Sequence, residues 1–220
     1  AQVDSPPARV SYTDDPGKNA APLGQLAEAS YRATLLPKLE AEMRAAYPNE
    51  SGPVDVRVTT SVDENGVVTM TVKAGFEGDF DADGKAPYDR TLRIDPKKQT
   101  VFLDEIEVSP DLRGKGVGDA GYAAEGAFLR DQFPGWTVGA KVRDVELLKE
   151  VQKLGDKARG RIGKMFEKQY EGLRVTADGG GMVNVVARIP DSRLAGPTVN
   201  VTLRSPDDGV SRAARVLEVD

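Results

Sequence analysis

One segment in the middle of the chain constrains the fold most, because a strand-like run leads through a proline turn into alternating glycines. Residues 101–108 form the run, Pro110 marks the turn, and glycines take every second position of residues 114–118. Glycine lets a backbone turn tightly and lets its amides approach a ligand without Cβ atoms in the way. The Ala-rich residues 119–132 predict a helix, whose free N-terminal amides and positive dipole end favour anions. The segment therefore predicts an anion-binding loop between a strand and a helix.

The spacing of this loop differs from that of other phosphate-binding loops. A Walker loop has a longer spacer between its first glycine and a Gly-Lys pair, and Ser or Thr follows that pair. A dinucleotide-binding loop has a different glycine spacing and lies in an early strand-helix-strand unit, which this chain lacks. The expected ligand-binding residues are Arg113, Gly114, Lys115, Gly116, Val117 and Gly118.

Periodicity on either side of the loop predicts an α+β (α/β) domain with a mixed sheet. Apolar residues recur every four positions over residues 23–47, which predicts helix, and Pro37 divides that helix in two. Alternating apolar residues at 54–58 and 68–72 predict strands, and the Asn-Gly pair between them predicts a hairpin turn. Further strands are expected at 90–95, 101–108, 136–142, 173–176, 182–189 and 198–203, and further helices at 119–132, 144–154 and 156–170.

Composition divides the chain into parts. Residues 1–22 are rich in Pro, Asp and Ser with few large apolar side chains, so we expect a flexible leader or linker. Residues 23–204 form the expected folded domain, and residues 205–220 a C-terminal tail. The first residue is not methionine, which suggests processing or excision from a longer protein.

Missing residue types exclude several kinds of chemistry. The chain has no cysteine and no histidine, which excludes disulfides, thiolate nucleophiles and Ser-His-Asp catalysis, and leaves few ways to bind zinc. The net charge of −5 argues against nucleic acid as a partner and suits a cationic substrate. No apolar run approaches the roughly 20 residues that span a bilayer. We expect a soluble, cytoplasmic protein without a membrane partner.

The central segment resembles the pyrophosphate-binding motif of GNAT N-acetyltransferases. The matching residues are Val108, Pro110 and the run Arg-Gly-Lys-Gly-Val-Gly that ends at Gly118. The resemblance implies a mixed, mostly antiparallel twisted sheet flanked by helices, with acetyl-CoA or another acyl-CoA as co-substrate. It also implies that the loop amides bind the pyrophosphate, and that the strand ending at Glu107 and Val108 pairs with the pantetheine arm.

The catalytic positions of that family match less closely. Phe102 stands where many members carry a glutamate on the central strand. Asp104, Glu105 and Glu107 are nearby candidates for the base that accepts a proton from an amine. Strict alternation places Asp104 on one face of the strand and the two glutamates on the other. A bulge, which the resemblance implies, would exchange those faces.

Tyr170 is the candidate proton donor to the leaving thiolate. The residues before it resemble a later family signature in degraded form, with Phe166 at the usual tyrosine position. Tyr170 follows one helical turn later, and a phenol can supply a proton to a sulfur anion. The same spacing equally suits packing in the core.

A short acidic stretch begins like a calcium-binding loop. Residues 79–84 carry Asp at alternate positions and a glycine for the turn. The twelfth position, where a calcium loop needs a bidentate Glu, is Arg90. We therefore expect an acidic turn here and no metal site.

The resemblance favours an acyltransferase that moves an acetyl or short acyl group from acyl-CoA to a primary amine. The acceptor would be a small molecule or a protein, and the amine would attack the thioester directly in a ternary complex. Two alternatives stay open. One is a catalytically silent GNAT-like binding or structural module, and the other is an effector or toxin-type domain excised from a larger secreted protein.

Overall fold

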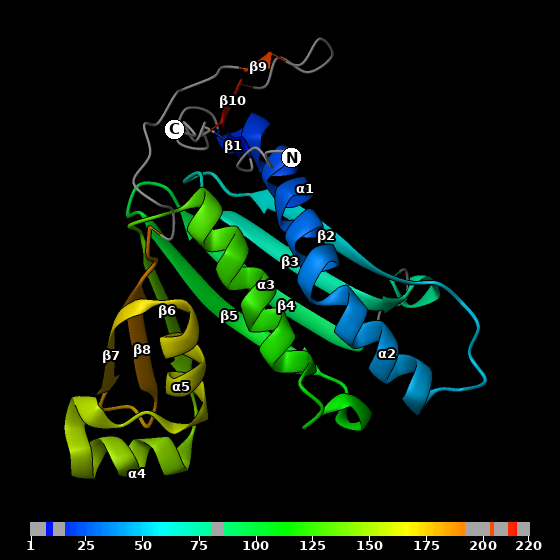
Figure 1. Cartoon of the computed structure of the whole chain (residues 1–220). Helices are drawn as coiled ribbons and strands as arrows, with labels where there is room; N and C mark the ends of the chain where they lie inside the picture. The colour runs from blue at the N-terminus through cyan, green and yellow to red at the C-terminus, as the bar shows by residue number, and fades with distance from the viewer. Residues whose placement is uncertain (1–7, 11–15, 81–85, 192–202, 205–210, 215–220) are drawn as a thin grey trace, which may run out of the picture.

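The structure is a computed structural model that describes residues 8–10, 16–80, 86–191, 203–204 and 211–214 (Figure 1). A seven-stranded sheet has the order β2-β3-β4-β5-β6-β8-β7, and only β5 and β6 pair in parallel. Its strands are β2 (Val54–Val62), β3 (Val68–Phe76), β4 (Tyr88–Asp95), β5 (Thr100–Val108), β6 (Thr137–Val142), β7 (Glu171–Ala177) and β8 (Val183–Arg188). The helices are α1 (Pro16–Thr34), α2 (Leu36–Ala46), α3 (Val117–Gln132), α4 (Val145–Leu154) and α5 (Gly160–Gln169). A small separate sheet joins β1 (Ala8–Val10), β10 (Ser211–Ala214) and β9 (Leu203–Arg204).

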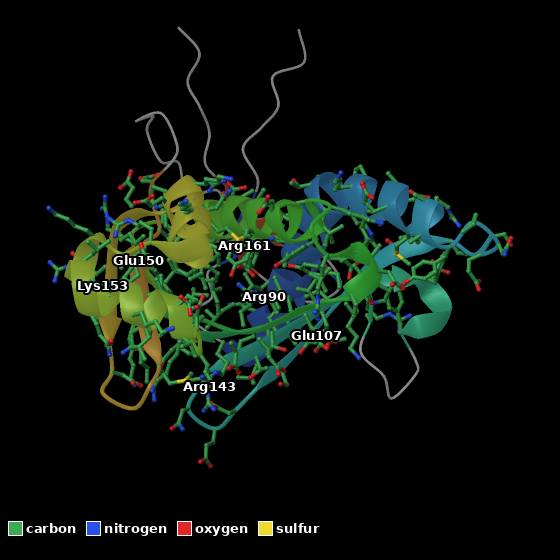
Figure 2. The ribbon with its side chains drawn as sticks, turned by 90° about the horizontal axis from the view of Figure 1, so that it is seen from below. Arg90, Glu107, Arg143, Glu150, Lys153 and Arg161 are labelled. Carbon is green, nitrogen blue, oxygen red and sulfur yellow. The ribbon has the colours of Figure 1, made fainter. Side chains whose placement is uncertain are left out.

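This arrangement confirms the predicted α+β class and the mixed, mostly antiparallel sheet flanked by helices. Side chains alternate along the strands, so Val68, Met70 and Val72 of β3 are buried while the threonines between them are half-buried. The buried face carries α1 and α3, which lie side by side across the strands (Figures 1 and 2). Among the described residues, no helix covers the opposite face of β3, β4 and β5, which we call the open face.

The paired helices at the start of the domain confirm the prediction from periodicity, and Pro37 lies in the first turn of α2. However, α1 already begins at Pro16, so residues 16–22 belong to a helix rather than to a leader. Ala20 packs into the main core, and this contact holds the additional turns in place. Pro22 lies inside α1, where its missing amide costs the helix one hydrogen bond.

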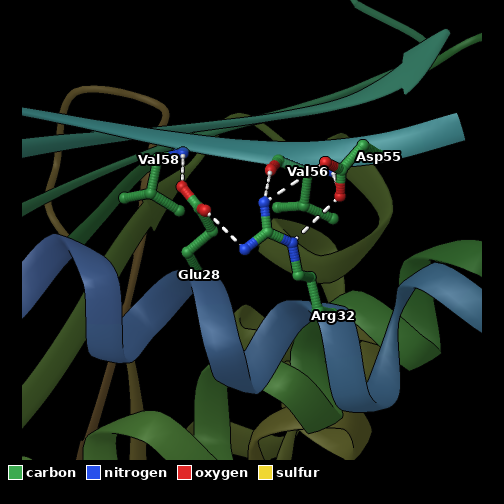
Figure 3. A network of polar contacts seen from close by, with 5 residues as sticks. All are labelled: Glu28, Arg32, Asp55, Val56 and Val58. Atoms are coloured by element: carbon green, nitrogen blue, oxygen red, sulfur yellow. Dashed lines mark hydrogen bonds and ion pairs between the residues drawn. The ribbon is translucent and has the colours of Figure 1, made fainter. Parts of the chain in front are cut away.

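Side chains of α1 cover the outer edge of the sheet at β2 (Figure 3). Glu28 accepts a hydrogen bond from the amide of Val58 at 3.1 Å, and Arg32 donates to the carbonyl oxygen of Val56 at 3.4 Å. Arg32 also contacts both carboxylate oxygens of Asp55, at 3.0 and 3.2 Å. An uncovered edge strand invites pairing with other chains, and these contacts occupy backbone groups of that edge.

The hairpin between β2 and β3 confirms the predicted turn, but its connection is longer than the Asn-Gly pair alone. The carboxylate of Asp63 accepts hydrogen bonds from the amides of Asn65 at 2.8 Å and Val67 at 3.0 Å. Gly66 has a φ of 78°, the left-handed conformation expected for the glycine of this pair. Asp63 therefore organises the turn together with the glycine.

Several boundaries differ from the sequence prediction or fall outside the described residues. The last helix begins at Gly160, after a 3-10 turn at Gly155–Lys157, rather than at residue 156. Most of the strand expected at 198–203, and residues 81–85 of the acidic stretch, lie outside the described residues. Within the described ranges, no group of acidic side chains could hold a metal ion, and no helix is long and apolar enough to cross a membrane.

Gly121 permits α3 to lie close to Tyr88 of β4. A Cβ atom at this position would lie 2.4 Å from the hydroxyl oxygen of Tyr88, whose side chain is buried. We expect Gly121→Ala to lower the free energy of unfolding by about 1–3 kcal/mol, because the ring has no room to move aside. Gly126→Ala is the control, since its added Cβ would meet the flexible ends of Gln169 and Arg130. Urea denaturation showing equal losses for both variants would contradict this account.

Candidate functional site

A bulge in β5 decides where its acidic side chains lie. The strand pairs one-to-one with β4 except at Asp104, which is an extra residue. Beyond the bulge, Ile106 lies opposite the buried Arg90 and therefore on the helix side of the sheet. Glu105 and Glu107 accordingly lie on the open face, and Figure 2 shows Glu107 on the side of the sheet away from α1 and α3. The bulge that the resemblance implied is thus present.

β5 and β6 separate beyond the bulge and leave a cavity between their carboxyl ends. Their pairing ends where Leu103 meets Ala140, although β5 continues to Val108. The cavity has a volume of about 470 Å³. Its walls are formed by Ile106, Glu107, Val108, Leu112, Arg113, Gly114, Gly116, Gly118, Tyr122, Val142, Arg143, Asp144, Arg161, Ile162 and Met165. In open α/β sheets, ligands usually bind in crevices at the carboxyl ends of parallel strands, and β5 and β6 are the parallel pair of this sheet.

The loop between β5 and α3 turns on glycines in the left-handed region. Gly114 has a φ of 73° and Gly116 a φ of 83°, which other residues rarely adopt. Gly118 lies in the first turn of α3, so its backbone does not require glycine. Nε of Arg113 donates to the carbonyl oxygen of Val108 at 2.9 Å and so ties the loop to the end of the strand.

Three glycines of the loop line the cavity, and their backbone amides have no hydrogen-bond partner in the described structure. α3 has no side-chain cap, and Ala120 donates to the carbonyl oxygen of Gly116 at 3.0 Å as the helix begins. Within the described part of the chain, no residue accepts a hydrogen bond from the amides of Gly114, Gly116 and Gly118. Gly114 is exposed and Gly116 and Gly118 are half-buried, so these donors are accessible. An anion in the cavity would accept hydrogen bonds from them at the positive end of the helix dipole.

Positive side chains predominate around this cavity. Arg113, Arg143 and Arg161 line it, against Glu107 and Asp144. The carboxylate of Asp144 is already engaged as the N-cap of α4, where it accepts a hydrogen bond at 2.9 Å. The local balance is therefore opposite to the net charge of −5, and it favours an anionic ligand.

A lysine of α2 adds to the charge at the loop. Cε of Lys38 lies 3.2 Å, and its Nζ 3.9 Å, from the place that a Cβ atom on Gly116 would occupy. The ammonium group also pairs with Glu42 at 2.9 Å. The sequence did not reveal Lys38 as a site residue, because the pattern of one helix does not show which distant loop it contacts.

Of the acidic candidates on β5, only Glu107 lines the cavity. Asp104 pairs with Arg93 at 3.6 Å, and Glu105 is exposed on the open face. Phe102 stacks against the guanidinium of Arg93, 4.8 Å from its ring centroid. The structure thus brings only one of the predicted carboxylates to the loop.

Tyr170, the predicted proton donor, is not among the residues that line the cavity. Its ring packs edge-on against Phe166, with 5.3 Å between the ring centroids. Its hydroxyl group is buried without a hydrogen-bond partner among the described residues. Burial raises the pKa of this phenol well above its ordinary value.

A buried ion pair, which the sequence did not predict, lies beneath the cavity. Arg90 donates to Glu125 through two hydrogen bonds of 2.7 and 2.8 Å, and the two side chains are 3% and 1% exposed. Tyr31 donates to the same carboxylate at 3.1 Å. The ring of Tyr122, which does line the cavity, lies 5.1 Å from the guanidinium carbon. The sequence did contain a hint of this pair. Arg90 falls in phase with the buried residues of β4, and Glu125 with those of α3.

Comparisons with known proteins do not identify a family for this chain. The sequence matches no protein-family model and no curated protein. Among solved structures, that of nourseothricin acetyltransferase is similar over 64% of this chain and 87% of its own, with 17% sequence identity and a TM-score of 0.33. A similarity of this degree assigns neither a family nor a function to this chain.

Proposed function

We propose that this protein binds an acyl-coenzyme A in the cavity between β5 and β6 and transfers its acyl group to a primary amine. The observation that supports this most is the set of partnerless amides at Gly114, Gly116 and Gly118, at the positive end of α3. A pyrophosphate there would accept from the amides and meet the charge of Lys38 and Arg113. β6 leaves one edge of β5 unpaired beyond Leu103. Carbonyl oxygens at that edge would accept hydrogen bonds from the amides of a pantetheine arm.

The reaction needs no covalent intermediate on the protein. The amine nitrogen attacks the thioester carbonyl carbon, the carbon–sulfur bond breaks, and its electron pair leaves with the thiolate. Glu107 lines the cavity and is the group we assign to accept the amine proton, directly or through water. Because the chain has no cysteine and no histidine, direct attack in a ternary complex is the route its residues suit best.

Isothermal titration with coenzyme A and acetyl-CoA tests the binding step. We expect both ligands to bind and to raise the melting temperature, because a ligand of the native state stabilises it by mass action. Absence of binding at millimolar ligand would overturn the proposal. Transfer itself is measured as thiol release from acetyl-CoA in the presence of a panel of primary amines.

Gly118→Ala separates ligand binding from folding. An added Cβ would have no atom within 4 Å, and Gly118 lines the cavity. Alanine favours a helix over glycine by up to about 1 kcal/mol, so the variant should fold at least as stably. We expect its affinity for coenzyme A to fall at least about tenfold, because the methyl group takes space beside the phosphates. Gly78→Ala, also in open space but outside the cavity, is the control and should bind normally.

A binding module without turnover is the second candidate. Phe102 occupies the position of the family glutamate, and the hydroxyl group of Tyr170 is buried away from the cavity. Coenzyme A binding without thiol release for any amine of the panel would favour this candidate over the enzyme.

A further inference from the structure

Tyr122 is the one tyrosine among the described residues that lines the cavity. It lies one helical turn after Gly118 on α3, and only 6% of its surface is exposed. Phe166 packs against its ring at a centroid distance of 6.4 Å, and the guanidinium carbon of the buried Arg90 lies over the ring, 5.1 Å from its centroid. The ring is therefore held in one place at the wall of the cavity.

The acceptors of the buried ion pair beside Tyr122 are already engaged. The guanidinium of Arg90 has only donors. Both carboxylate oxygens of Glu125 already accept from Arg90, and one of them accepts from Tyr31 as well.

Burial keeps the hydroxyl hydrogen of Tyr122 on the phenol. It raises the pKa of Tyr122 above its ordinary value, while the neighbouring Arg90 opposes this rise. The group is thus a neutral donor at neutral pH rather than a phenolate.

We propose that the hydroxyl group of Tyr122, whose ring is fixed at the wall of the cavity, donates a hydrogen bond to a carbonyl oxygen of the acyl-pantetheine arm. This inference rests on the proposed acyl-CoA binding and assigns to Tyr122 a role that sequence reasoning gave to Tyr170. Two kinds of carbonyl group in acyl-CoA can accept this hydrogen bond, the thioester carbonyl and the pantetheine amide carbonyls. In the first case Tyr122 polarises the reacting bond, and in the second it fixes the position of the arm.

Tyr122→Phe removes the hydroxyl and keeps the ring, and titration with two probes distinguishes the carbonyls. Free coenzyme A has the pantetheine amides but no thioester, whereas acetyl-CoA has both. If Tyr122 binds the thioester carbonyl, the variant should lose about fivefold in affinity for acetyl-CoA and nothing for coenzyme A. If it binds a pantetheine amide, both affinities should fall about equally.

Tyr88→Phe is the matched control, because it deletes a buried hydroxyl that has no partner in the described structure and does not line the cavity. Its affinities should equal those of the wild type. Wild-type affinity of Tyr122→Phe for both probes would overturn the inference, and so would a loss confined to Tyr170→Phe. If the wild type itself binds neither probe, the proposed function fails, and that result is distinct from a failure of Tyr122 alone.

Discussion

Replacing Gly116 by valine is expected to lower the affinity for coenzyme A by at least about 100-fold, or about 2.7 kcal/mol. Gly116 has a φ of 83°, which a β-branched residue rarely adopts, so the loop would have to change shape. An added Cβ would also lie 3.2 Å from Cε of Lys38 and would push that side chain from the loop. The variant therefore disturbs both the amides and a positive charge. Titration calorimetry on the folded variant measures the effect.

The control for backbone strain is Gly135→Val. Gly135 has the same φ of 83°, has no atom within 4 Å of an added Cβ, and does not line the cavity. Gly135→Val should lower the free energy of unfolding through a comparable backbone strain, and the variant should bind coenzyme A normally. If both valine variants bind with wild-type affinity, the segment 113–118 is only a connection between a strand and a helix, and the proposed function loses its main support.

Removing the carboxylate of Glu125 is expected to cause the largest loss of stability. Glu125→Ala leaves the guanidinium of Arg90 buried without its bidentate partner. An uncompensated buried charge of this kind costs about 3–5 kcal/mol in the free energy of unfolding. We expect urea denaturation to show a loss in this range.

The double variant Arg90→Met with Glu125→Leu tests whether the ion pair itself stabilises the fold. Well-packed apolar replacements of buried pairs are often neutral or stabilising, so we expect the double variant to recover most of the loss. If Glu125→Ala alone leaves the free energy of unfolding unchanged, water reaches the guanidinium of Arg90 despite its low exposure. If the double variant is as unstable as the single one, the loss comes from the missing volume and not from the charge.

The sequence predicted the features that depend on residues close together in the chain, and it missed those that depend on contacts between distant residues. Glycines at alternate positions predicted a tightly turning loop, and in the structure Gly114 and Gly116 turn it through left-handed conformations. The proline at 37 predicted the division of the first helical region, and the alternation of apolar residues predicted β2 and β3. These features depend on residues close together in the chain, where φ preferences and side-chain periodicity act directly.

The composition of the site was decided by contacts between distant residues. The extra residue at Asp104 turns Glu107 to the open face, and the length of a strand does not reveal in which pair a bulge occurs. Tyr170 and Tyr122 carry the same phenol, but only the packing of α3 against α5 and β4 brings Tyr122 to the cavity. The sequence by itself therefore determined the loop and the class of fold. The tertiary structure alone decided which side chains meet the ligand, because burial and pairing depend on partners that local patterns do not encode.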